Sequence, residues 1–135
     1  MTTNGQAWNQ GLEIVDAVYG AGFPTMMEPY KDHRFNQEIV TNRFGNLWVD
    51  PALSIRAKRL MVLGLTTMLG WADLIVTQVT GALLNNELTD EQLELNPHFL
   101  LFYAGAGNTT ALFREIEAAR AKVNAARAGQ TRPGD

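Results

Sequence analysis

Few side chains in this sequence have the types and spacing that catalysis or metal binding requires. The chain contains no Cys, which excludes disulfides, thiolate zinc sites and a cysteine nucleophile. Its two His residues, His33 and His98, lie in neither an H-x-x-x-H nor an H-E-x-x-H pattern. We therefore expect neither thiol chemistry nor a His-based metal site.

Size and charge narrow the class of protein further. The 135 residues fit one domain, and a hydrophobic content of 46% supplies ample material for a core. The 11 basic residues are scattered among 14 acidic ones, for a net charge of −3. Because no basic stripe is present, we expect no nucleic-acid partner.

One apolar stretch, Leu60–Leu84, is long enough to cross a bilayer and carries a single charge, Asp73. Gly70 interrupts it in the middle, and Thr and Gln residues are distributed along it. We interpret it as two short buried helices joined at Gly70 rather than a transmembrane span. The N-terminus has no basic n-region and no apolar h-region, so we expect a cytoplasmic protein without a secretory signal.

Helical periodicity, turn residues and the lack of alternating β-patterns predict an all-α fold. Thr89-Asp-Glu-Gln92 is a capping box, and Asp50-Pro51 has the residue types that open a helix. We expect Pro97 to kink or split the helix that Thr89 starts. The predicted helices cover residues 8–19, 33–44, 50–69, 72–84, 89 onward and 108–126. Residues 1–126 should form a single helical domain, followed by a disordered tail at 127–135.

Five segments carry a resemblance to a known family. In order and spacing they are similar to the carboxymuconolactone decarboxylase family over about residues 10–115. The most specific parts are the turn Gly81–Thr89 and the F-Y-A-G segment Phe102–Gly105. The segments are QGLEIVDAVYG, FNQEIVTNRFGNLW, DPALSIRAKRLMVLGL, QVTGALLNNELTDEQL and FYAGAGNTTALFR. The chain departs from the pattern at Leu84, which looks inserted, and at Pro97 and Gly107.

The resemblance implies an antiparallel bundle of about six helices of the alkylhydroperoxidase-D-like type. It also implies a ring-shaped homo-oligomer, a trimer or a hexamer, and cofactor-free chemistry. Since the helices around Leu60–Leu84 are apolar over much of their circumference, we expect them to be central to the subunit contacts.

One branch of that family consists of thiol peroxidases that use a C-x-x-C-x-x-x-H motif and a Glu one helix earlier. The two Cys positions fall on Trp71 and Leu74, the His position on Gln78 and the Glu position on Arg59. All four residues are replaced, so we expect no peroxidase activity.

The other branch consists of decarboxylases that act on a small carboxylated lactone. Arg56 matches a basic position there and would anchor a carboxylate, or is a solvated helix residue. Gln78 stands at this branch's His position. If the chain is a lyase, we expect Arg56, Gln78 and Tyr103 to converge between the third, fourth and fifth helices, with Gln78 and Tyr103 donating hydrogen bonds to a developing oxyanion. The branch's Glu position is Asn46. His98 would then supply the proton, unless it is a surface residue.

Further side chains could complete this site. Glu38 is either a substitute acid facing the cavity or a solvent-facing carboxylate. Trp48, Trp71 and Phe99 would form the substrate-binding wall together with Phe102 and Tyr103, although Trp48 and Phe102 fit ordinary core positions better. Such a wall is apolar and suits a cyclic ketone, quinone or lactone.

Two functions follow from these residues. The first is a cofactor-free lyase acting on a small cyclic carboxylated or carbonyl compound by decarboxylation, or by a related lyase or hydrolytic step. The second is a catalytically silent binding or assembly protein that keeps the fold and the oligomer.

Overall fold

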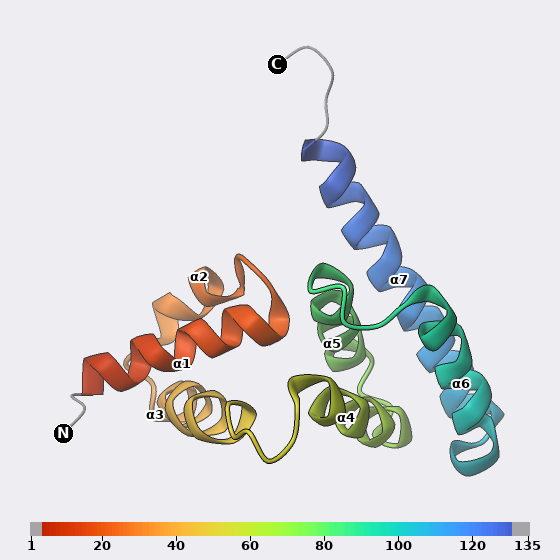
Figure 1. Cartoon of the computed structure of the whole chain (residues 1–135), viewed down its shortest axis with the longest axis horizontal. Helices are drawn as coiled ribbons and strands as arrows, with labels where there is room; N and C mark the ends of the chain where they lie inside the picture. The colour runs from red at the N-terminus through yellow and green to blue at the C-terminus, as the bar shows by residue number, and fades with distance from the viewer. Residues whose placement is uncertain (1–3, 131–135) are drawn as a thin grey trace. The chain divides into compact units, whose positions relative to one another are not determined.

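The computed structural model describes residues 4–130, and within this range the chain is helical and contains no β-strand (Figure 1). The predicted all-α bundle is thereby confirmed. The chain divides into two compact units, with the boundary between Lys58 and Arg59. The single domain predicted for residues 1–126 stays a prediction, and each unit is described by itself.

The N-terminal unit is built on α1 (Asn4–Tyr19), which packs against a π-helical segment, η2 (Ile39–Trp48). Buried Val15 and Val18 on α1 and Val40 and Phe44 on η2 form the core of this unit. Shorter elements connect the two. They are α2 (Phe23–Met27), the 3₁₀ helix η1 (Glu28–Tyr30) and α3 (Arg34–Glu38), which runs directly into η2.

Gly11 allows α1 and η2 to approach each other closely. A Cβ atom at Gly11 would lie 2.1 Å from the backbone oxygen of Val40, far inside van der Waals contact. Only a residue without a side chain fits this contact, so the helix packing of the N-terminal unit depends on Gly11.

The C-terminal unit consists of most of α4 (Ile55–Leu69) with α5 (Ala72–Leu84), α6 (Asp90–Ala104) and α7 (Ala106–Gln130). Both α5 and α6 pack along α7, the longest helix (Figure 1). One hydrophobic cluster joins the four helices through Leu63 of α4, Val79 of α5, Leu93 of α6 and Leu112 of α7.

Several predicted boundaries are confirmed. Helix α4 ends at Leu69, Gly70 adopts a left-handed φ of 69°, and α5 begins at Ala72, so Leu60–Leu84 is two helices joined at Gly70. In the described part of the chain, no helix is long and apolar enough to cross a membrane. Both hydrogen bonds of the Thr89–Gln92 capping box are present at the start of α6.

Other boundaries were predicted wrongly. The second predicted helix continues through Gly45 as far as Trp48. Helix α4 starts at Ile55 rather than at Asp50, because the Ser54 hydroxyl accepts from the Ala57 N–H while Asp50 accepts from Ala52 within a preceding turn. Helix α6 runs through Pro97, so the helix is not split there, and the alternative of a kink stays a prediction.

The tail was predicted to start at residue 127, but α7 continues to Gln130. Alanine is the best helix former, and Ala125, Ala126 and Ala128 extend the helix. The Arg127 guanidinium also donates to the Leu83 carbonyl at 3.2 Å, which ties this last turn to α5. The rest of the predicted tail, residues 131–135, lies outside the described residues.

Candidate functional site

Two positions that the family resemblance assigns to a site, Arg59 and Gln78, lie in a buried cluster of charged and polar groups in the C-terminal unit. Arg59 on α4 is 0% exposed and Gln78 on α5 is 1% exposed. The Arg59 Nη1 donates to both the backbone oxygen and the side-chain Oε1 of Gln78, at 3.0 Å each. Its Nε and Nη2 face the two carboxylate oxygens of Glu87, so that this ion pair is bidentate.

Local structure explains why these three residues meet. The short connection at Gly70 turns the chain between α4 and α5, and Gln78 of α5 then meets Arg59 of α4. After α5 ends, Asn86 adopts a left-handed φ of 51° and the Glu87 N–H donates to the Ala82 carbonyl at 2.9 Å. This turn directs Glu87 back toward Arg59.

The positive and negative charges of the cluster balance each other. A bidentate carboxylate neutralises the Arg59 charge, and the Glu87 side chain keeps only 12% of its surface exposed. Removing one member would leave an uncompensated buried charge, which proteins tolerate poorly. Its chemistry is therefore that of a structural ion pair and not that of an acid–base relay.

The resemblance had placed a Glu at the Arg59 position and a His at the Gln78 position. The side chains that occupy these positions, Arg59 and Gln78, are in direct contact, as the two groups of a proton relay would have to be. A guanidinium and an amide cannot exchange a proton near neutral pH. Glu87 was not predicted as a member of the site, although it is the only charged residue in the turn Gly81–Thr89.

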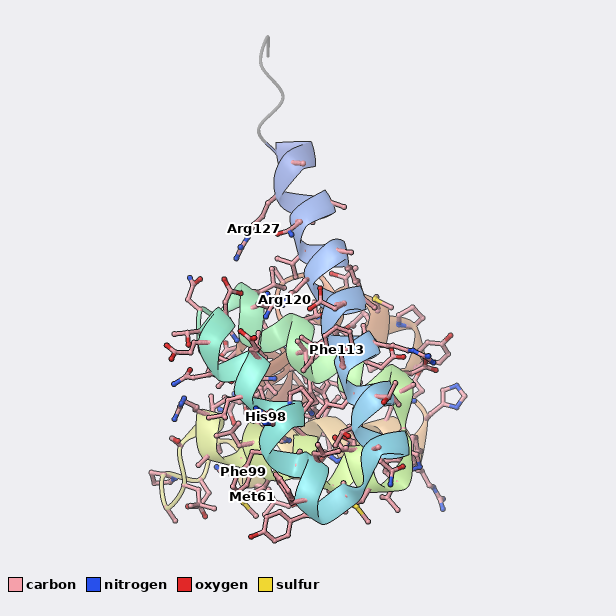
Figure 2. The ribbon with its side chains drawn as sticks, turned by 90° about the vertical axis from the view of Figure 1, so that its right-hand side faces the viewer. Met61, His98, Phe99, Phe113, Arg120 and Arg127 are labelled. Carbon is pink, nitrogen blue, oxygen red and sulfur yellow. The ribbon has the colours of Figure 1, made fainter. Side chains whose placement is uncertain are left out.

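The other predicted residues of the C-terminal unit lie at its surface. His98, Phe99 and Tyr103 are exposed on α6, where the rings of Phe99 and Tyr103 lie 5.6 Å apart between centroids. Figure 2 labels His98 and Phe99 on α6 and Phe113 on α7, the helix that packs against α6. Phe102 is 84% exposed, so the interpretation of this residue as core was wrong.

Trp71, the remaining candidate of this unit, is half-exposed. It borders an open hollow of about 460 Å³ with Gly70 and residues 72–74. A groove of about 250 Å³ lies between α6 and α7, lined by Leu93, Pro97, Phe113 and Arg120 among others. Gln78, His98 and Tyr103 line neither of these hollows.

Three candidates belong to the N-terminal unit. Trp48 is buried and stacks on Phe44 with 6.2 Å between ring centroids, as its interpretation as core requires. Arg56 is exposed, and its convergence with Gln78 and Tyr103 stays a prediction. Glu38 is exposed and accepts a hydrogen bond from Asn42 at 2.7 Å. The exposure of Glu38 fits the solvent-facing alternative.

The N-terminal unit also contains a hollow of about 330 Å³ between the start of α1 and the Lys31–Thr41 segment. Trp8 forms part of its wall and donates its indole N–H to Glu28 at 3.2 Å. Among residues 4–130, no group of three His, Asp or Glu side chains is placed to hold a metal ion.

Comparisons with protein-family models, with curated proteins and with solved structures found no match for this chain. The resemblance to the carboxymuconolactone decarboxylase family therefore stays a prediction from the sequence motifs, and so does the alkylhydroperoxidase-D-like identity of the fold.

Proposed function

We propose that this chain is a cytoplasmic, catalytically silent protein that uses a decarboxylase-like helical fold for self-assembly into a homo-oligomer. The observation that carries the proposal is the closed Arg59–Gln78–Glu87 cluster. A working relay needs a group that gains and loses a proton in the transition state. Here the resemblance gives the relay of the peroxidase branch to Arg59 and Gln78, which bond to each other, and the Glu position of the decarboxylase branch to Asn46. None of these three side chains is a general acid or base near neutral pH.

Exposed apolar residues support the assembly half of the proposal. Met61, Leu65 and Met68 on α4 are each more than half exposed, although they alternate with the buried Leu63 and Thr67. Large apolar side chains gathered on a surface favour contact with another protein. A ring-shaped oligomer, a trimer or a hexamer, would cover this face.

The test combines a turnover assay with a size measurement on the purified full-length chain. Carboxylated lactones, cyclic ketones and quinones are offered as substrates, and a hydroperoxide is offered with a dithiol reductant. We expect no turnover above the buffer blank and an oligomer by light scattering. Turnover of any of these compounds would overturn the silent part, and a monomer throughout the micromolar range would overturn the assembly part.

The same assay decides the lyase alternative. If a lactone is turned over, Arg56→Ala and His98→Ala would each remove most of the activity, by about 10²–10⁴-fold for loss of a general acid. Tyr103→Phe would then cost roughly 10²–10³-fold as the loss of one oxyanion donor. If these variants turn over the lactone as fast as the wild type, the activity does not arise at this site and a contaminating enzyme is its source.

A further inference from the structure

Helix α6 has an apolar surface on the side that faces away from its own core. Leu95, Phe99 and Phe102 recur at intervals of four and three residues, so they share one face, with Tyr103 beside them. Their exposed fractions are 59%, 60%, 84% and 76%, respectively. The opposite face carries the buried Leu93 and the partly buried Leu100, which pack on the core cluster. We call Leu95, Phe99, Phe102 and Tyr103 the α6 stripe.

The α6 stripe is large for the surface of an isolated unit. A buried aromatic side chain covers 150–250 Å², so the exposed parts of its three aromatic residues amount to roughly 330–550 Å². That alone equals the largest apolar patch of a typical monomer, about 300–600 Å². Leu95, which is 59% exposed, adds to it. The stripe therefore supplies a large part of the roughly 800 Å² that each partner contributes to a stable interface.

Charge on α6 narrows the kind of partner. The helix has no Lys or Arg, and its acidic residues Asp90, Glu91 and Glu94 all precede the stripe. Surfaces that bind anionic lipid headgroups carry basic residues around their apolar face, and this helix has the opposite charge. The segment from Leu95 to Ala104 contains no Asp or Glu, so a neutral apolar surface suits it best.

A second copy of the same helix offers such a surface. In an antiparallel pair, the acidic first turn of each α6 lies beside the uncharged last turn of the other, and the two acidic segments sit at opposite ends of the interface. The helix dipoles then also oppose each other favourably. A parallel pair would instead place Glu91 and Glu94 of both copies together.

We propose that a second copy of this chain docks on the α6 stripe, with the two α6 helices antiparallel about a two-fold axis near Phe99. Such an interface is isologous, so Phe99 meets its own counterpart and Leu95 meets Tyr103 of the other copy. This proposal rests on the self-assembly part of the proposed function. Of the two oligomers proposed there it requires the hexamer, because a closed trimer has no two-fold axis.

The first test is a charge placed in the stripe. Phe99→Glu and Phe102→Glu change exposed residues, so circular dichroism should show an intact fold. At an interface centre, such residues commonly act as hot spots, and the dimer Kd should rise by at least about 30-fold in light scattering or sedimentation. Phe35→Glu is the matched control, because Phe35 on α3 is 73% exposed and lies outside the stripe. It should leave the Kd unchanged.

The second test uses the absence of cysteine, which makes single-cysteine variants free of background. Phe99→Cys should form an intermolecular disulfide on mild oxidation, whereas Phe35→Cys should not. Mixing Leu95→Cys with Tyr103→Cys should give the mixed disulfide in preference to either homodimer, as only the antiparallel arrangement brings these positions together.

The outcomes distinguish the α6 stripe interface from the more general proposal that the chain self-assembles. A wild-type monomer would overturn both. An oligomer that persists in Phe99→Glu and gives no Phe99→Cys disulfide would overturn the stripe interface and leave self-assembly standing. Binding of monomers to anionic vesicles that Phe99→Glu abolishes would assign the stripe to a membrane and overturn the dimer.

Discussion

The guanidinium of Arg59 holds Gln78 at two points, the backbone carbonyl and the side-chain Oε1, at 3.0 Å each, while its other edge pairs with Glu87. These contacts fasten α4 to α5 and fix the turn that follows α5. Because the cluster is buried, its members depend on one another more than surface partners do.

Glu87→Gln should therefore destabilise the C-terminal unit strongly. The amide cannot neutralise Arg59, and breaking a buried pair by removing one partner costs about 3–5 kcal/mol. Urea unfolding followed by circular dichroism measures the loss. Glu117→Gln is the control, because Glu117 pairs with Arg120 at 3.6 Å on the surface and such pairs contribute about 0–1 kcal/mol.

Replacing both charged residues by apolar ones tests whether the instability of Glu87→Gln comes from an uncompensated buried charge. The double variant Arg59→Met/Glu87→Leu leaves no buried charge and should recover most of the stability lost in Glu87→Gln. A double variant as unstable as the single one would mean that the ion pair contributes specific stabilising energy beyond mutual compensation.

The sequence predicted the helices whose ends carry unambiguous signals. Gly70 and Asn85 bracket α5, and the Thr89 capping box starts α6, so these bounds were right. At the start of α4, Asp50-Pro51 and Ser54 compete as helix starts, and only the contacts decide in favour of Ser54. Strong local signals therefore gave the bounds of α5 and the start of α6, whereas two competing signals misplaced the start of α4. The lone Gly45 did not end η2, which continues to Trp48.

The site was harder to predict because it depends on tertiary contacts. Arg59 and Glu87 are 28 residues apart and meet only through the turns at Gly70 and Asn86. Helix α6 is apolar on both faces, so its periodicity could not show that Leu93 and Leu100 are inside while Phe99 and Phe102 are outside.

Gly11→Ala should destabilise the N-terminal unit. The added Cβ would meet the Val40 backbone at 2.1 Å, and relief requires α1 and η2 to separate. Overpacking of this kind costs about 1–3 kcal/mol, visible as a lower midpoint in thermal or urea unfolding. Gly64→Ala on α4 is the matched control, since a Cβ there meets nothing within 4 Å. It should stabilise by about 0.5–1 kcal/mol, because glycine weakens a helix interior.

Thr89→Ala should lower the stability of the C-terminal unit by about 1 kcal/mol. The variant loses the hydrogen bond from the Gln92 N–H to the Thr89 hydroxyl, at 3.1 Å, which satisfies a free donor at the start of α6. Thr77→Ala is the comparison, because its hydroxyl bonds to the Asp73 carbonyl inside α5 and caps no helix. If both variants lose the same free energy of unfolding, the capping hydrogen bond stabilises the unit no more than a hydroxyl bond inside a helix.

Gln78→His restores the residue that the family resemblance places at this position, and we expect it to restore no activity. A new imidazole would stand beside Arg59, a cation, and the Glu position of the decarboxylase branch would still carry Asn46. The variant also loses the Oε1 acceptor of a buried donor, so the free energy of unfolding should fall by about 1–3 kcal/mol. Steady-state assays with carboxylated lactones and urea unfolding measure the two effects. Lactone turnover in Gln78→His, absent from the wild type and from Gln78→Asn, would contradict this expectation and show that the site retains the rest of a decarboxylase and that Gln78 alone silences it.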